Sequence, residues 1–319
     1  MKLKLFASAV FAVIAIVLLP PFGSTGRLEL AGGWGEHGSG PGQMNEPMGI
    51  ASDAEGNIYV ADTRNARIQK FTSEGKYILE FGERGDGAGE FSKPVGLAID
   101  GEGALYVSDY DIDRIQKFSS KGVYLHGWGE SGKEPGGVNV AAGIHIDRKR
   151  KVIYIADFYN KRVSKFNLDG RFLSQVGSSG RVWSGAIHYP TDVYVDDGGN
   201  VYVADAYNNR IQKFGPDGEY LAKWGSPFGF GIAGRWRGWF KIPSGVAVGP
   251  QGRIYVADSA NHRVVALSPD GRFLAEWKIE GEIIPYTPTK ITVGKSGIIY
   301  AVDTAHDRIL MLKYVETGK

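Results

Sequence analysis

Six aspartates in this chain are each followed by an arginine five residues later, and paired acidic and basic side chains can support proton transfer. Each pair lies in a similar stretch, such as "IYVADTRNARIQKF" beginning at Ile58. A feature that recurs in every copy of a repeat normally serves the architecture of that repeat, so we interpret the pairs as structural. We expect each aspartate to cap the turn into the following strand by accepting hydrogen bonds from backbone N–H groups. The pairs are Asp62 and Arg67, Asp109 and Arg114, Asp157 and Arg162, Asp205 and Arg210, Asp258 and Arg263, and Asp303 and Arg308.

Four other polar residues stand where the repeated pattern has small side chains. Two positions after the first proline of a copy (Ala141 in the third copy), four copies have glycine, but the other two have Asp192 and Lys290. Two positions further along, His145 and Tyr194 replace the alanine or threonine of the other copies. If these segments line a central channel, the four side chains converge near its mouth as a polar ligand site. The alternative is that His145 and Tyr194 only fill space between neighbouring copies.

An enzyme site at this channel mouth is the alternative to a simple binding site, and a metal-dependent lyase or hydrolase is its sharpest form. Catalytic zinc requires three convergent protein ligands and an open position. The six histidines fall at unlike positions in the copies, and the chain has no cysteine, so no cofactor is predicted. Calcium, held by backbone carbonyls and Asp192, stays open as an alternative. No Gly-x-Ser-x-Gly sequence or phosphate-binding loop stands out.

The stretch "SPFGFGIAGRWRGWFKIP", Ser226 to Pro243, has neither the period of a buried helix nor the alternation of a strand. From Gly225 to Pro243 it spans 18 positions, whereas the corresponding spans Gly35–Pro47 and Gly82–Pro94 have 12. Exposed aromatic groups beside cations mark interaction sites, so we predict that this loop binds a protein, peptide or carbohydrate ligand. The alternative is that its tryptophans fold back over the channel as a plug. The predicted binding residues are Trp236, Trp239, Phe240, Arg235, Arg237 and Lys241.

The repeats also indicate the fold that positions these residues. Successive aspartates of the repeated pairs are 47, 48, 48, 53 and 45 residues apart. Each copy contains four short β-rich runs separated by Gly and Asp turns, as in "PVGLAID", "LYVSD" and "RIQKF" of the second copy, which predicts antiparallel hairpins. Four strands per unit and six units predict an all-β, six-bladed β-propeller. Because the sixth copy lacks its fourth strand, residues 27–34 are expected to complete it beside residues 306–314 and so remove a free sheet edge.

In such a propeller, two kinds of connection lie on one face, which we call the top face. They run from each fourth strand to the next first strand, and from each second strand to the third. The long loop 226–243 is one of these connections. Next to the repeated aspartates of copies two to four stand Tyr110, Phe158, Tyr159 and Tyr207, which make this part of the top face aromatic. We interpret these rings either as a binding rim or as ordinary exposed side chains.

The pattern "P-x-G-[IL]-A-[IV]-D…IYVAD…N-x-R-I-Q-K-F" resembles the NHL repeat, and the resemblance covers residues 27–314. It implies a six-bladed fold. NHL propellers include RNA-binding regulators, extracellular sensor domains and a peptide-amidating lyase, so the fold alone does not give the function. The lyase of this family carries zinc on inner-strand histidines in a "P-H-[DG]" context. The corresponding residues here, none of which is histidine, are Met48, Val95, Ala142, Thr191, Ser244 and Thr289.

The first residues, "MKLKLFASAVFAVIAIVLLPPFGSTG", have the form of an export signal. Two lysines precede an apolar stretch from Leu5 to Leu19, and small residues end the segment at Gly26. We expect residues 1–26 to be a signal peptide, with an uncleaved membrane anchor through residues 5–22 as the alternative. Residues 27–319 are expected to form the propeller, which is then secreted or periplasmic, or attached to the membrane only through this segment.

The charge balance argues against nucleic acid as a partner. Lysine plus arginine total 37 and aspartate plus glutamate total 35 among 319 residues, so the net charge is near zero. The basic run at residues 148–151 is interpreted as a solvated turn, with contact to anionic envelope surfaces as the alternative. We therefore predict an exported, monomeric propeller that binds a ligand on its top face rather than catalysing a reaction.

Overall fold

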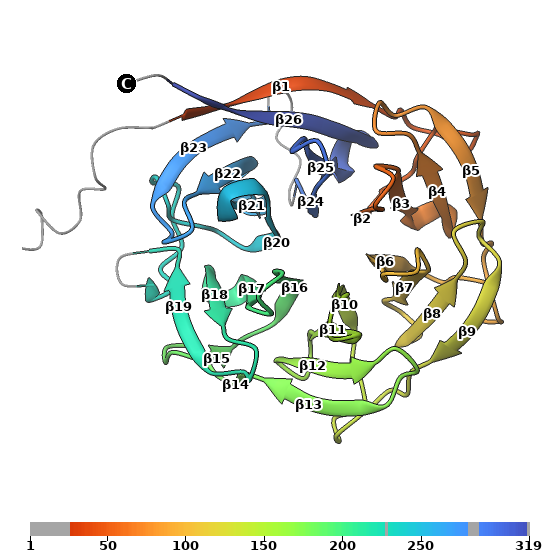
Figure 1. Cartoon of the computed structure of the whole chain (residues 1–319), viewed down its shortest axis with the longest axis horizontal. Coiled ribbons are helices and arrows are strands. Elements are labelled where there is room, and N and C mark those ends of the chain that lie inside the picture. Colours follow the sequence, from red (N-terminus) through yellow and green to blue (C-terminus); the bar gives the residue numbers. More distant parts are fainter. Residues whose placement is uncertain (1–25, 227–228, 280–286, 318–319) are drawn as a thin grey trace, which may run out of the picture.

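The computed structural model describes residues 26–226, 229–279 and 287–317, which form a ring of six four-stranded antiparallel sheets (Figure 1). These residues contain strands and short 3-10 turns but no α-helix. The all-β, six-bladed propeller predicted from the repeats is therefore confirmed. The first strand of each sheet lies nearest the axis of the ring, and the fourth lies at its rim (Figure 1).

The strands follow the same order in every blade. Blade one contains β2 (Gly49–Ser52), β3 (Ile58–Asp62), β4 (Arg67–Phe71) and β5 (Tyr77–Phe81). Blade two contains β6 (Pro94–Ile99), β7 (Leu105–Asp109), β8 (Arg114–Phe118) and β9 (Tyr124–Trp128). Blade three contains β10 (Ala141–Asp147), β11 (Val152–Asp157), β12 (Arg162–Asn167) and β13 (Phe172–Val176). Blade four contains β16 (Pro190–Val195), β17 (Val201–Asp205), β18 (Arg210–Phe214) and β19 (Tyr220–Trp224). Blade five contains β20 (Pro243–Val248), β21 (Ile254–Asp258), β22 (Arg263–Leu267) and β23 (Phe273–Lys278). Blade six contains β24 (Ile291–Val293), β25 (Ile299–Asp303), β26 (Arg308–Glu316) and β1 (Gly26–Trp34).

The core lies between neighbouring blades, because the second strand of each blade is covered on both faces. Every residue of β3, β7 and β17 is buried, whereas the outer strand β5 alternates between half-buried and exposed side chains. Burying one large apolar side chain contributes about 1.5–3 kcal/mol to stability. The stacked second strands are therefore the main source of the stability of the propeller. Each second strand buries one tyrosine in this way, namely Tyr59, Tyr106, Tyr154, Tyr202, Tyr255 and Tyr300.

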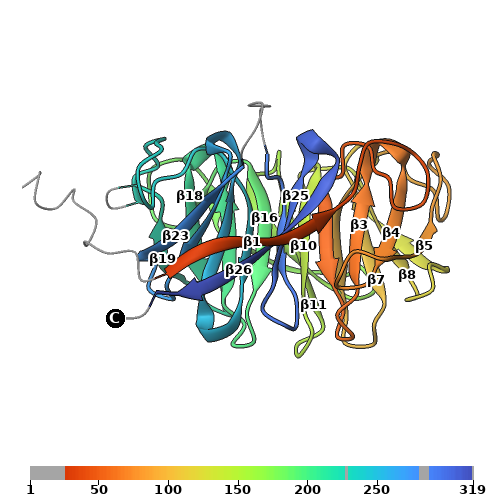
Figure 2. The same ribbon diagram turned by 90° about the horizontal axis from the view of Figure 1, so that it is seen from above.

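The first strand of the described chain belongs to the last blade. β1 pairs antiparallel with β26, from Gly26 opposite Glu316 to Trp34 opposite Ile309. The two strands lie side by side at the rim of blade six (Figures 1 and 2). This pairing joins the beginning of the propeller to its end.

The two faces of the ring carry different connections (Figure 2). The hairpin turns between first and second strands, and between third and fourth strands, form the bottom face. The top face carries the loops into each first strand and the turns between second and third strands. Four of these turns contain a 3-10 turn, namely η1 (Thr63–Asn65), η2 (Ala206–Asn208), η5 (Ser259–Asn261) and η6 (Thr304–His306).

The repeated aspartates and arginines form ion pairs at the top of the blades. The arginine Nε lies 2.7–2.9 Å from the aspartate Oδ2 in blades one, three, four, five and six. In blade four both side chains, Asp205 and Arg210, are fully buried. In blade two, Arg114 instead donates to the backbone carbonyl oxygens of Asp86 and Gly87. This geometry agrees with a structural role.

The predicted cap on the turn into the third strand is wrong for most blades. The turns η1, η2, η5 and η6 have no side-chain cap. Instead, the second carboxylate oxygen accepts a hydrogen bond from the loop that leads into the same blade, as from the N–H of Asn45 to Asp62 at 2.7 Å. The loop and the end of the second strand meet at the top of the blade, so the carboxylate reaches across to the loop. Asp109 departs from this pattern, since it also accepts from the N–H of Asp111 in its own turn.

The predicted signal peptide or anchor, residues 1–26, lies outside the described residues except for Gly26. In the part of the chain that the structure describes, no helix is long and apolar enough to cross a bilayer. Export and the domain boundary at residue 26 therefore stay predictions.

Candidate functional site

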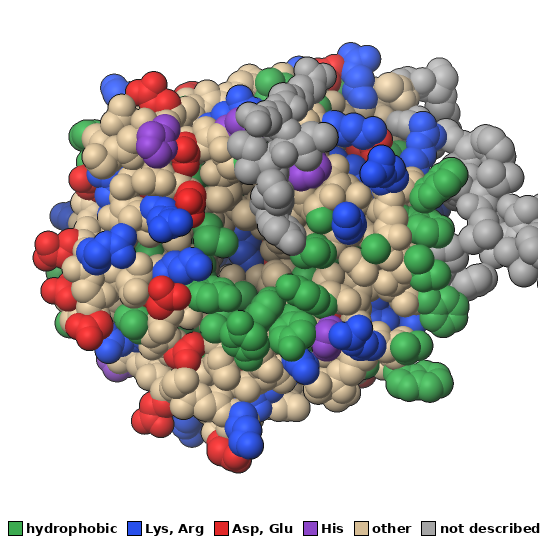
Figure 3. All heavy atoms as spheres, turned by 180° about the vertical axis from the view of Figure 1, so that it is seen from behind, with side chains coloured by type: hydrophobic (Ala, Val, Ile, Leu, Met, Phe, Trp, Pro, Cys, Tyr) green, Lys and Arg blue, Asp and Glu red, His purple; other side chains and the backbone are tan. Residues whose placement is uncertain are grey.

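Four aromatic rings form a continuous cluster on the top face, over blades three and four. Phe158 and Tyr159 lie in the turn between β11 and β12, Tyr189 directly precedes β16, and Tyr207 lies in η2. The ring centroid of Phe158 is 4.9 Å from that of Tyr189 and 5.0 Å from that of Tyr159, and Tyr189 is 5.0 Å from Tyr207. Tyr159 and Tyr207 are each 51% exposed. Figure 3 shows hydrophobic side chains gathered beside the central opening of this face. We call these four residues the aromatic cluster.

The backbone around the aromatic cluster is held by hydrogen bonds between loops. The N–H of Phe158 donates to the carbonyl oxygen of Val140, and the N–H of Tyr207 donates to that of His188. Tyr189 has a φ of 54°, in the left-handed region that a non-glycine residue adopts only when its surroundings determine it. The rings are therefore presented in fixed positions.

A buried histidine lies beside the aromatic cluster. The ring of His188 is 4.4 Å from that of Tyr189, and its Nδ1 has no hydrogen-bond partner among the described residues. Burial lowers the pKa of His188, and the positive charges of Arg181 and Lys161 lower it further, so the imidazole is neutral at neutral pH. This nitrogen is itself buried, so it faces the interior of the protein and does not lie on the surface that a bound molecule would contact.

Two lysines lie over tyrosines at the edge of the aromatic cluster. The Nζ of Lys161 is 4.9 Å from the ring centroid of Tyr189, and the Nζ of Lys93 is 4.3 Å from that of Tyr110. Burial raises the pKa of Tyr110, and the neighbouring phenol of Tyr159 raises it further. Tyr110 thus extends the aromatic surface toward blade two, and this surface combines apolar ring faces with hydroxyl groups.

The sequence analysis found part of this surface and missed two residues of it. Tyr110, Phe158, Tyr159 and Tyr207 were identified from the sequence, and the structure brings them together. His188 and Tyr189 were missed. They form the pair "HY" before the first proline of the fourth copy, where copies one, two, three and five have no aromatic residue. That departure from the repeat was the available signal.

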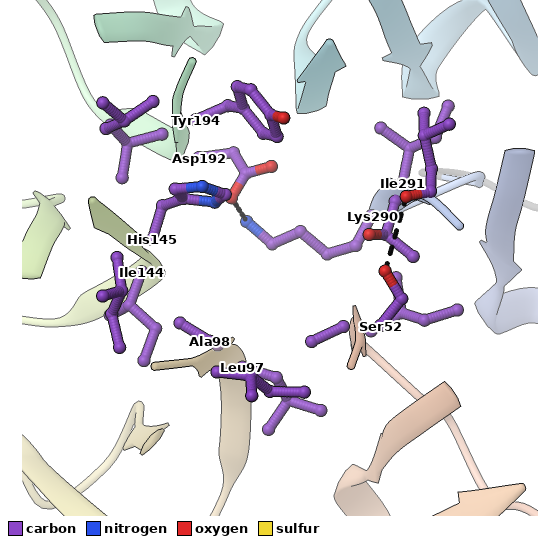
Figure 4. Close-up of a pocket in the computed structure, with 18 of the residues that line it drawn as sticks. Ser52, Leu97, Ala98, Ile144, His145, Asp192, Tyr194, Lys290 and Ile291 are labelled. Atoms are coloured by element: carbon purple, nitrogen blue, oxygen red, sulfur yellow. Dashed lines mark hydrogen bonds and ion pairs between the residues drawn. The ribbon is translucent and has the colours of Figure 1, made fainter. Parts of the chain in front are cut away.

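The four polar channel residues meet inside the ring (Figure 4). The Nζ of Lys290 lies 2.9 Å from the Oδ1 of Asp192, and it also donates to the carbonyl oxygen of Thr191. The Oδ2 of Asp192 accepts a hydrogen bond of 3.0 Å from the N–H of Val246. Lys290 directly precedes β24 and Asp192 lies in β16, so this ion pair connects blade six to blade four.

The two aromatic channel residues are in contact and uncharged at neutral pH. The rings of His145 and Tyr194 are 4.3 Å apart. Burial, together with a smaller effect of the nearby positive charge of Arg148, lowers the pKa of His145 to about 4. Burial raises the pKa of Tyr194 to about 12. Since efficient proton transfer requires a pKa near the working pH, these values disfavour either group as a general acid or base at pH 7.

A cavity of about 500 Å³ lies in the channel beside these residues. Its wall includes Ala51, Leu97 and Ala98 and extends to the first hairpin turns at the bottom face, as at Asp53 and Asp147. Its volume suits a small molecule. None of the described residues of the loop 226–242 lines this cavity, so the structure gives no support to the tryptophans as a channel plug.

The sequence left a catalytic metal site and a calcium site open as alternatives. Among the described residues, no group of three or more His, Cys, Asp or Glu side chains is arranged to hold a metal ion. The calcium alternative depends on Asp192. Its carboxylate is already engaged by the Lys290 ammonium and by the N–H of Val246.

The long loop of blade five contains both exposed and buried rings. Trp236 is 72% exposed, Trp239 is partly buried against Gly234, and Phe240 is fully buried. The prediction that Phe240 binds a ligand is therefore wrong, because its ring lies in the core between blades four and five. It stands three residues before the first proline of its copy (Ala141 in blade three). Blades one to four fill this position with a buried apolar residue, namely Met44, Phe91, Val138 and Ile187.

The cations of the long loop lie at the surface. Arg235, Arg237 and Lys241 are all exposed, and the guanidinium of Arg237 is 5.6 Å from the ring centroid of Phe273. The N–H of Lys241 donates to Asp258, which fixes the end of the loop. The loop thus presents its cations to solvent while Phe240 anchors it in the core.

Comparison with known proteins identifies the repeat. Three segments match the NHL repeat, at residues 44–71, 188–214 and 240–267. A 48-residue stretch is 48% identical to protein brain tumor of Drosophila melanogaster, and a 44-residue stretch is 50% identical to the B-box type zinc finger protein ncl-1 of Caenorhabditis elegans. These stretches cover 15% and 14% of this chain but only 5% of each relative, so the likeness concerns the repeat and not the whole relatives.

Solved structures agree with the architecture. A catalytically inactive virginiamycin B lyase from Staphylococcus aureus with quinupristin has a TM-score of 0.60 and 16% identity, over 91% of this chain and 88% of that chain. A chain of a nidogen/laminin complex has a TM-score of 0.56 and 18% identity, over 77% of this chain and 84% of that chain. At such identities the similarity shows the fold alone. The matched repeats and the six four-stranded blades together identify this chain as a six-bladed β-propeller built from NHL repeats.

Proposed function

We propose that this chain is an exported binding module whose top face takes up a protein, peptide or carbohydrate ligand on the aromatic cluster. The observation that carries the proposal is the packing of Phe158, Tyr159, Tyr189 and Tyr207 into one surface beside the channel. Aromatic side chains supply a large contact area at a low cost in conformational entropy, and they dominate binding hot spots for this reason. The ring faces and phenol hydroxyls together suit a ligand that has both apolar and hydrogen-bonding groups.

The aromatic cluster carries this proposal better than the long loop from which the sequence analysis started. Its rings pack against one another and rest on backbone hydrogen bonds between loops. Phe240 of the long loop is in the core, and Trp236 packs against none of the four rings of the aromatic cluster.

Selection of binders from a random dodecapeptide display library, together with a glycan array, tests the proposal. Ligands found with the full chain should bind about tenfold or more weakly to the Tyr159→Ala/Tyr207→Ala double variant, because a hot-spot ring contributes more than about 1 kcal/mol. Trp183→Ala is the matched control, since its ring is exposed in a different loop. Ligands that bind the double variant and the wild type equally well would contradict the proposal.

An exported lyase or hydrolase is the second candidate, and the channel cavity beside Asp192 and Lys290 favours it. Elemental analysis of the purified chain, after dialysis without chelator, separates the two functions. A stoichiometric metal that is lost in an Asp192→Ala variant whose circular dichroism spectrum is still that of the folded wild type would favour the enzyme. A metal content that is unchanged by this variant would count against a metal site in the channel.

We also propose that residues 1–26 direct export and that the mature chain is a monomer. N-terminal sequencing of protein recovered from an extracellular or periplasmic fraction should begin at Arg27. An intact N-terminus in the membrane fraction would support the anchor instead, and an intact N-terminus in the cytoplasm would contradict export. Sedimentation equilibrium of the recovered protein tests the monomer.

A further inference from the structure

Five hydrophobic side chains project from the top loops of blades four and five, outside the aromatic cluster. Trp183 is 80% exposed, and Val182, Phe230, Ile232 and Trp236 are each more than half exposed. Soluble monomers normally expose large hydrophobic side chains singly, so a group of them marks an interaction surface. We call these five residues the loop patch.

Two repeat arginines hold the loops of the patch beside each other. The guanidinium of Arg210 donates to the carbonyl oxygen of Trp183 at 3.2 Å and to that of Gly229 at 3.3 Å, so it links the loops into blades four and five. Arg263 donates to the carbonyl oxygen of Trp236 at 3.1 Å. Both arginines are also buried partners of the repeated ion pairs. The backbone that carries the exposed rings is therefore held in place by hydrogen bonds from two buried guanidinium groups.

The charged side chains of these two loops are all basic. Residues 177–189 and 225–242 contain no aspartate or glutamate. At the edge of the patch, the Nζ of Lys223 is 5.3 Å from the ring centroid of Phe230. None of the five cations forms an ion pair with any residue in the described ranges. The five cations are Arg181, Lys223, Arg235, Arg237 and Lys241.

We propose that the loop patch docks onto the surface of an anionic lipid bilayer. Tryptophan favours the bilayer interface, and exposed Phe and Ile side chains give apolar surface that can enter the acyl boundary. Cations that lack an acidic partner in the protein are attracted to anionic headgroups. Trp183 is 80% and Trp236 is 72% exposed, so both rings are free to insert between headgroups.

The predicted export of the chain would bring the propeller close to a lipid bilayer. The apolar stretch Leu5–Leu19 directs the chain to a membrane, both as a signal peptide and as an anchor. Tyr189 of the aromatic cluster lies in the same loop as Val182 and Trp183, whereas Phe158, Tyr159 and Tyr207 lie in other turns of the top face. The inference stands whether or not the aromatic cluster binds a ligand.

Hydrogen–deuterium exchange of the full chain tests the proposal, with phosphatidylcholine vesicles and with vesicles that also contain phosphatidylglycerol. A local readout is needed because residues 5–22 can attach the chain by themselves. With the anionic vesicles, the backbone amides of residues 181–185 and 229–242 should exchange at about one tenth of their free rate or more slowly. Residues 158–161 of the aromatic cluster should not change, and added salt should weaken the protection.

Two surface variants separate the apolar and the basic contributions. Trp183→Ser/Trp236→Ser and Arg235→Gln/Arg237→Gln should each lose the protection while keeping the wild-type melting temperature, since all four side chains are exposed or partly exposed. Tyr159→Ala/Tyr207→Ala is the matched control and should keep the protection. Absence of added protection on anionic vesicles, equal protection on both kinds of vesicle, or full protection in both patch variants would overturn the proposal in favour of an acidic protein partner.

Discussion

The ammonium nitrogen of Lys290 lies 2.9 Å from a carboxylate oxygen of Asp192, and the two side chains come from blades on either side of blade five. Both side chains are about nine-tenths buried. Burial raises the pKa of Asp192 and lowers that of Lys290, and the charge of each residue opposes the shift of the other. The pair therefore behaves as one unit, in which neither charge is tolerated without its partner.

Removing one member of this pair should destabilise the propeller strongly. We expect Asp192→Ala to lower the free energy of unfolding by about 3–5 kcal/mol, because it leaves the Lys290 ammonium buried without a partner. The double variant Asp192→Leu/Lys290→Met removes both charges and should recover most of that loss. Urea denaturation monitored by tryptophan fluorescence measures both values. Equal destabilisation by the single and double variants would show that the charges do not depend on each other.

Acid should destabilise the chain through His145. The pKa of His145 is about 4 in the folded chain, compared with about 6.5 in the unfolded chain. Between these two values the unfolded chain binds a proton that the folded chain does not bind, so the free energy of unfolding falls as the pH falls from 6.5 to 4. By pH 4.5 the loss from this residue is roughly 2 kcal/mol.

The variant His145→Gln isolates this contribution, because all other titrating groups are kept. Chemical denaturation of both proteins at pH 7 and pH 4.5 gives the comparison. The wild type should lose roughly 2 kcal/mol more than the variant on acidification. A loss of the same size in both proteins would mean that the histidine is protonated in the folded chain.

The buried repeat arginines should contribute far more to stability than surface ion pairs. Arg210→Ala removes the ion pair with Asp205 and the bonds to the two loops above it, and should cost about 3–5 kcal/mol. Arg272→Ala is the matched control. Its pair with Asp270 has the same nitrogen-to-oxygen geometry, at 2.9 Å, but both side chains are mostly exposed, so the loss should be below about 1 kcal/mol. Similar losses in the two variants would argue against a structural role of the repeated pair.

Replacing two aromatic residues of the long loop with alanine, one at a time, should change the free energy of unfolding by very different amounts. Phe240→Ala opens a cavity in the core between blades four and five and should lower the free energy of unfolding by about 3–5 kcal/mol. Trp236→Ala removes a ring that is mostly in solvent and should change stability by less than about 0.5 kcal/mol. Thermal or urea denaturation of the two variants measures the contrast. A large loss with Trp236→Ala would mean that this ring packs against the propeller.

The fold could be predicted because six copies of one pattern report the same structure independently. The channel residues could be found for the same reason, since Asp192, Lys290, His145 and Tyr194 replace small residues of the repeat. The structure brings all four together in one channel. A departure from a repeat is thus a useful signal when it falls on a strand whose direction is known.

The remaining errors concern contacts between segments far apart in the sequence. Phe240 was assigned to the surface because its neighbours are unusual, although its position in the repeat is that of a core residue. Tyr189 joins Phe158 only because the loop into blade four lies beside a turn of blade three. The repeated aspartates reach across to loops 16–18 residues earlier in the chain, which local turn chemistry does not predict.

The pairing of β1 with β26 has a consequence for the biosynthesis of the chain. β1 is synthesised before β26 and cannot pair with it until the chain has been made as far as Glu316. During that interval the finished blades can stack only as an open arc, with unpaired N–H and C=O groups at both ends. Joining residues so distant in sequence is slow, because the entropy of closing the loop is lost before the contacts form. Loss of β26 therefore leaves β1 without a partner, whereas loss of β1 turns β26, which still pairs with β25, into a free edge.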